Sequence, residues 1–116
     1  MLVPGTRSHE EQQHMKSISP TDAHAVADAW ILDVREDHEL EQARVDDAHH
    51  IPLGTLVDRL DEVPRDRTVY VMCHAGGRSA QATEYLSTQG VDAVNISGGI
   101  TEWYRAGLPL TIGGTA

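Results

Sequence analysis

The chain has 116 residues, with 9 Lys and Arg against 18 Asp and Glu, so its net charge is −9 with neutral histidines. This length suits one domain, and the acidic surplus disfavours binding to nucleic acids or anionic membrane surfaces. No apolar run approaches the roughly 20 residues of a membrane span. The single cysteine excludes an intrachain disulfide. A lone thiol and an N-terminus unlike a signal peptide predict a cytoplasmic protein.

Composition along the chain divides it into a domain and two tails. Residues 1–15 are polar and show no apolar periodicity, so we expect a flexible N-terminal tail there. Residues 111–116 are small and predict a flexible C-terminal tail. The domain is therefore expected over residues 16–110.

Helical and strand patterns alternate within this domain. Ser19 and Pro20 predict an N-cap and first helical residue, followed by apolar residues at helical spacing up to Trp30. Strands are then predicted over residues 31–34, 48–52, 69–72 and 93–96. Helices are predicted over residues 36–44, 53–60, 78–89 and 98–105. Strands joined by helices indicate an α/β fold, a mostly parallel sheet covered on both faces.

The only cysteine follows the strongest predicted strand, where ligands bind in open α/β sheets. Cys73 is followed by a short loop and then a helix. The residues of this expected binding loop are His74, Ala75, Gly76, Gly77, Arg78 and Ser79. A glycine-rich loop can turn several N–H groups inward, and the helix N-terminus adds partial positive charge. Both effects favour the thiolate, so the segment predicts a reactive nucleophile rather than a buried structural cysteine.

Three motifs resemble one known family. The first is Cys73-x-x-Gly76-x-Arg78-Ser79, the second is Leu32-Asp33-Val34-Arg35-Glu36 with Glu39, and the third is Gly98-Gly99 followed by Trp103, Gly107 and Pro109. Together they resemble the signatures of single-domain rhodanese-like sulfurtransferases and span residues 31–109. The resemblance implies a three-layer fold with about five strands. The chain departs from the family pattern at Ala43 and Asp47, where glycines are usual.

The resemblance implies two-step sulfur transfer through Cys73. The thiolate would take the sulfane sulfur of a small anionic donor such as thiosulfate, and the persulfide would pass it to cyanide, a thiol or a protein acceptor. The loop N–H groups would stabilise the charge on sulfur, and Arg78 would be a fixed local cation for the donor. Ser79 is expected to cap the helix, although it could instead donate to the anion. A protonated His74 would lower the pKa of the thiol.

Asp33 and Arg35 follow a predicted strand at the same sheet edge. They could form a polar wall of the pocket, but we expect a structural ion pair between Arg35 and Glu39. Trp103 is expected in the core or in a pocket wall. The seven histidines show no ligand spacing for a metal, so we expect neither a metal nor a cofactor. We expect a monomer or a weak dimer.

Two other functions remain open. Cysteine phosphatases and arsenate reductases use C-x5-R, whereas four residues separate Cys73 from Arg78. A smaller ring suits a single persulfide sulfur better than a phosphoryl group. A rhodanese-like module could also bind or regulate without turnover, although such modules often lack the cysteine.

Overall fold

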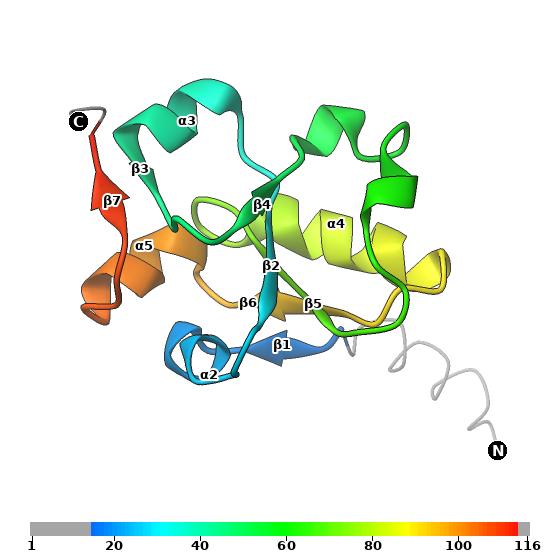
Figure 1. The fold of residues 1–116 in the computed structure, drawn as a ribbon, viewed down its shortest axis with the longest axis horizontal. Helices are drawn as coiled ribbons and strands as arrows, with labels where there is room; N and C mark the ends of the chain where they lie inside the picture. Colours follow the sequence, from blue (N-terminus) through cyan, green and yellow to red (C-terminus); the bar gives the residue numbers. More distant parts are fainter. Residues whose placement is uncertain (1–14, 114–116) are drawn as a thin grey trace, which may run out of the picture.

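The computed structural model describes residues 15–113 and is built around one parallel sheet (Figure 1). Its five strands are β1 (Ser17–Ile18), β2 (Trp30–Asp33), β4 (His49–His50), β5 (Val69–Met72) and β6 (Ala93–Ile96). Their order is β1-β6-β5-β2-β4, and all neighbouring strands run parallel. The predicted α/β fold is thereby confirmed, and β5 is the central strand.

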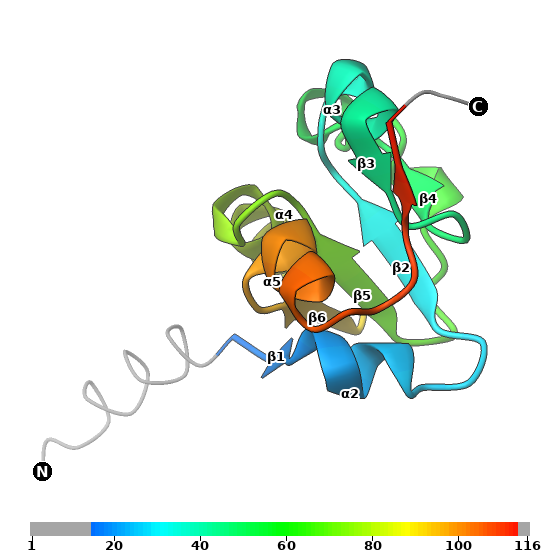
Figure 2. The same cartoon turned by 90° about the vertical axis from the view of Figure 1, so that its left-hand side faces the viewer.

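Helices flank this sheet and a small two-stranded sheet lies beside it. The helices are α2 (Pro20–His24), α3 (Asp37–Gln42), α4 (Gly77–Thr88) and α5 (Gly99–Arg105), with the short 3-10 helices η1 (Leu53–Thr55) and η2 (Leu60–Glu62). The small sheet pairs β3 (Ala43–Arg44) with β7 (Thr111–Ile112) in antiparallel fashion. Figures 1 and 2 both show β7 running next to β3. Among the described helices, none has the length and apolar character needed to cross a membrane.

The sheet is buried on both faces because alternate residues of its strands point to opposite sides. Val69 and Val71 of β5 join a core cluster that includes Leu86 of α4. Met72 of the same strand joins a second cluster with Trp103 of α5. All five side chains are at most 1% exposed. The two clusters hold the central strand rigidly, and with it the residue that follows its carboxyl end.

The first predicted helix is too long. The cap is confirmed, because the Ser19 hydroxyl accepts a hydrogen bond from the Asp22 N–H at 3.1 Å. The helix ends at His24, however, and Asp28 adopts a positive φ of 56°. Trp30, placed on the helix by its spacing, instead begins β2. A left-handed residue interrupts the helix, so the helical spacing up to Trp30 is coincidental.

The helix predicted over residues 53–60 is also wrong. The segment forms η1 and η2 with turns between them, and Val57 is exposed. Gly54 and the β-branched residues that follow it favour a helix weakly, so only short 3-10 turns form.

All three four-residue strands were predicted, with β2 displaced by one residue, and β4 lies within the strand predicted over residues 48–52. β5 and β6 coincide with the predictions for residues 69–72 and 93–96. β1, β3 and β7 were not predicted, since two residues carry no periodicity. Residues 111 and 112, expected in the C-terminal tail, form β7. Nearly all of the expected N-terminal tail, residues 1–14, lies outside the described residues.

Candidate active site

Cys73 lies where β5 ends and the loop to α4 begins. Its neighbour Met72 pairs in register with Asp33, the last residue of β2. The loop turns at Gly76, whose φ of +112° is left-handed and favours glycine, and α4 begins at Gly77. Cys73 is therefore fixed between the central strand and the N-terminus of a 12-residue helix.

The Cys73 sulfur is enclosed by its loop, and the residue is only 1% exposed. The Gly76 N–H donates to Sγ at 3.1 Å. Burial raises the pKa of Cys73, but the hydroxyl of Ser79 and the N–H groups of Ser79, Gly76 and Arg78 lower it, and the net shift is downward. The predicted cradle is present and favours the thiolate.

Ser79 has a different position from the expected one. The N-cap of α4 is Gly76, so Ser79 lies in the first turn and does not cap the helix. Its hydroxyl is buried, donates to the Gly76 carbonyl at 3.2 Å and contributes to lowering the pKa of Cys73. Ser79 is therefore part of the sulfur's immediate surroundings.

The start of α5 holds the backbone of the loop that follows Cys73. The Ile100 N–H donates to the Cys73 carbonyl at 2.8 Å. The N–H and hydroxyl of Thr101 both donate to the His74 carbonyl, at 3.1 and 2.9 Å. A Cβ on Gly99 would lie 2.3 Å from the Cys73 carbonyl oxygen. The Gly98-Gly99 pair, read from sequence as a tight turn, thus also permits this close approach.

Arg78 is not a free cation. Its guanidinium binds both carboxylate oxygens of Glu39 on α3, at 2.6 and 2.8 Å. The hydrogen bond from Arg78 lowers the pKa of Glu39 to about 2, and the same bond raises the pKa of Arg78. Glu39 is therefore ionised at neutral pH and compensates the charge expected to attract the donor.

Arg35 has a different partner from the predicted one. Its guanidinium binds the Asp33 carboxylate, with Nη2 2.8 Å from Oδ2, and both side chains are buried. Arg35 does not bind the Glu39 carboxylate but donates to the Glu39 backbone carbonyl, at 3.3 Å. It also donates to the Ala43 carbonyl, at 2.8 Å. Asp33 and Arg35 therefore form a structural pair that joins β2 to α3 and β3.

The remaining loop residues lie on the outside. His74, Ala75 and Gly77 are exposed. His74 is bound through its backbone carbonyl, and among the described residues no hydrogen bond to its ring is found. The role of its imidazole stays a hypothesis.

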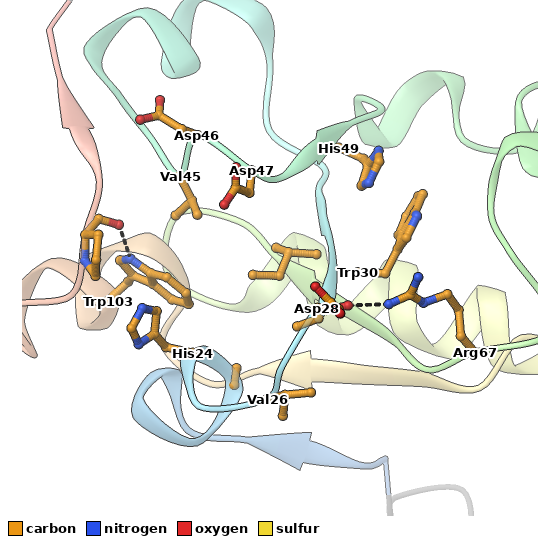
Figure 3. A pocket seen from close by; sticks show the side chains of 14 residues that line it. His24, Val26, Asp28, Trp30, Val45, Asp46, Asp47, His49, Arg67 and Trp103 are labelled. Atoms are coloured by element: carbon orange, nitrogen blue, oxygen red, sulfur yellow. Dashed lines mark hydrogen bonds between the residues drawn. The ribbon is translucent and has the colours of Figure 1, made fainter.

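A separate cavity of about 790 Å³ opens around the start of β2 (Figure 3). Trp30 stacks on His49 there, with ring centroids 3.9 Å apart, and His24 contacts Trp103 edge-on. Trp103 is buried and lines this cavity, which confirms its predicted role as a core residue and pocket wall. Cys73 does not line the cavity, since it lies at the opposite, carboxyl end of the strands.

Residues 12–106 match the family model described as a rhodanese-like domain. The chain belongs to this family. A rhodanese-related protein from Thermoplasma volcanium superimposes with a TM-score of 0.79 at 35% identity, over 83% of this chain and 97% of that one. A sulfurtransferase of Allochromatium vinosum is 40% identical over 72% of this chain and 78% of the relative. The thiosulfate sulfurtransferase GlpE of Vibrio cholerae is 32% identical over 71% of this chain and 78% of the relative.

These relatives place the rhodanese-like chain among sulfurtransferases at the level of the family. The resemblance drawn from its three motifs is confirmed. The motifs come together in space, because the Cys73 loop contacts α3 through Arg78 and Glu39, and α5 through Ile100 and Thr101.

The lowered pKa of Cys73 predicts a shifted alkylation profile. Iodoacetamide reacts with the thiolate, so the midpoint of its rate against pH should lie below the value of about 8.5 for a free thiol. Ser79→Ala removes a hydroxyl that lowers the pKa of Cys73 and should raise this midpoint. Mass spectrometry at several pH values gives both profiles, with the urea-unfolded protein as the reference. A native midpoint at or above that of the unfolded protein would refute thiolate stabilisation by the loop.

Proposed function

We propose that this protein transfers a sulfane sulfur from a donor such as thiosulfate to a thiophilic acceptor through a Cys73 persulfide. The observation that supports this most is the donor environment of Sγ, which accepts the Gly76 N–H at 3.1 Å and lies in a loop whose N–H groups and Ser79 hydroxyl lower the pKa of Cys73. These donors are preorganised for a negatively charged sulfur, and the single cysteine leaves one nucleophile for the reaction.

In the first half-reaction, the Cys73 thiolate attacks the outer sulfur of the donor. The new S–S bond forms as the donor's own S–S bond breaks, and for thiosulfate the bonding electron pair leaves with sulfite. The persulfide then carries its charge on the outer sulfur, near the loop N–H groups and the N-terminus of α4. In the second half-reaction, cyanide, a small thiol or a protein thiol attacks that sulfur, and the Cys73 thiolate is released.

Intact mass after brief incubation with thiosulfate tests this proposal. The parent protein should gain one sulfur, about +32 Da, as expected for a covalent intermediate, and cyanide should remove it with release of thiocyanate. Cys73→Ala should show neither change. If the parent gains no mass and instead hydrolyses an aryl phosphate, the phosphatase alternative holds. If it does neither, the domain functions as a binding module.

A further inference from the structure

The ion pair between Arg78 and Glu39 joins α4 to α3, and further hydrogen bonds hold Glu39 in place. Arg78 lies in the first turn of α4, and its side chain is about one-third exposed. Glu39 is more buried, and its Oε1 also accepts the Glu36 N–H at 2.9 Å, which closes a capping box on α3. The backbone of Glu39 is held by Arg35. The carboxylate therefore has a fixed position opposite the guanidinium.

No other lysine or arginine among the described residues is available to the site. Five of them bind carboxylates: Lys16, Arg35, Arg44, Arg59 and Arg105. Arg65 and Arg67 donate to backbone carbonyls and precede β5, so they lie at the end of the strand opposite to Cys73. With Arg78 compensated, the attraction for an anion comes from the N–H groups of the loop and α4.

We propose that Glu39 is a specificity-determining residue, which cancels the charge of Arg78 and so disfavours dianionic sulfur donors relative to donors with one negative charge. The inference rests on the sulfur transfer proposed above and specifies its donor class. A dianion gains twice as much from an uncompensated cation as a monoanion does. Glu39 removes this advantage without touching the sulfur, because it acts through Arg78.

Two donors with the same reacting bond separate charge from chemistry. Thiosulfate carries two negative charges and benzenethiosulfonate carries one. In both, the Cys73 thiolate attacks the terminal sulfur, and the S–S bond breaks with its electron pair on the departing sulfite or benzenesulfinate. Cyanide accepts the sulfur in each assay, so thiocyanate release gives kcat/KM for both donors. The ratio of the two values reports the preference for the dianion.

Glu39→Gln is the direct test, because the amide removes the charge while its oxygen can still accept the Glu36 N–H. We expect the ratio of thiosulfate to benzenethiosulfonate kcat/KM to rise about fivefold at low ionic strength. The donors differ by one negative charge, and that extra charge would interact with an uncompensated Arg78. The rise should shrink in high salt. The matched control is Glu41→Gln on the same helix, which changes the net charge equally at an exposed residue. It should leave the ratio unchanged.

Arg78→Gln makes the test independent of how well Glu39→Gln folds. It leaves the Glu39 charge unopposed, so the ratio should fall below that of the parent. In the double variant, Glu39→Gln with Arg78→Gln, the ratio should return to within about twofold of the parent value, since both charges are gone. This ordering of the three variants is specific to electrostatics, because a merely structural role would change both donors by the same factor.

The outcomes separate the two proposals. If the parent uses both donors but Glu39→Gln leaves the ratio unchanged, or Glu41→Gln raises it equally, the role of Glu39 is refuted and sulfur transfer stands. If the parent forms no persulfide and releases no thiocyanate with either donor, the proposed function fails, and the inference fails with it.

Discussion

Replacing Asp33 by alanine should lower the free energy of unfolding by about 3–5 kcal/mol, the usual cost of removing one partner from a buried ion pair. Asp33 and Arg35 are 1% and 2% exposed. The Asp33 carboxylate accepts the Nε and Nη2 groups of Arg35 and also its backbone N–H. Without the carboxylate, the guanidinium stays buried with only two carbonyl partners. Urea denaturation followed by circular dichroism measures the loss.

A double variant shows whether the loss comes from the unpaired charge. Asp33→Ala combined with Arg35→Met removes both charges and keeps an apolar chain in the site. It should be more stable than Asp33→Ala alone, because no charge remains buried without a partner. If the double variant loses the sum of the two single losses, the pair does not act as a unit and this explanation is wrong.

Elements that depend on neighbouring residues were predictable from the sequence. Short runs of mostly apolar, β-forming residues predicted the bounds of β5 and β6, and Gly76-Gly77 marked the turn into α4. Cys73 was predicted to be the nucleophile from this strand, loop and helix order, and the structure places it at that junction. The evidence for each lies within a few residues of the chain.

Ion-pair partners that depend on the folded structure could not be predicted from the sequence. The expected pair of Arg35 with Glu39 is wrong because side-chain direction decides between carboxylates at similar separations in sequence. Arg35 turns back to Asp33, the last residue of β2, and Glu39 binds Arg78, which lies 39 residues further along the chain. The periodicity up to Trp30 failed for a related reason, since Asp28 takes a left-handed turn that spacing alone does not reveal.

The contact between the Cys73 loop and α5 is another long-range feature, and Gly99→Ala tests it. The new Cβ would lie 2.3 Å from the Cys73 oxygen and 2.6 Å from the His74 oxygen. Both are backbone atoms, so the loop or the start of α5 must move. A displacement of about 1 Å in a catalytic group typically costs about 100-fold in rate. We expect a loss of this order in kcat/KM for sulfur transfer to cyanide, measured as thiocyanate release.

Gly107→Ala is the matched control for this variant. Gly107 also has a left-handed backbone, with φ of +74° against +57° for Gly99, but a Cβ there would meet no atom within 4 Å. Both variants carry the backbone cost of a side chain at positive φ, of order 1 kcal/mol, and only Gly99→Ala carries the clash. Gly107→Ala should therefore lose some stability yet keep most of its activity. Equal losses of activity in the two variants would mean that backbone strain, and not the approach of α5 to the Cys73 loop, explains the need for glycine.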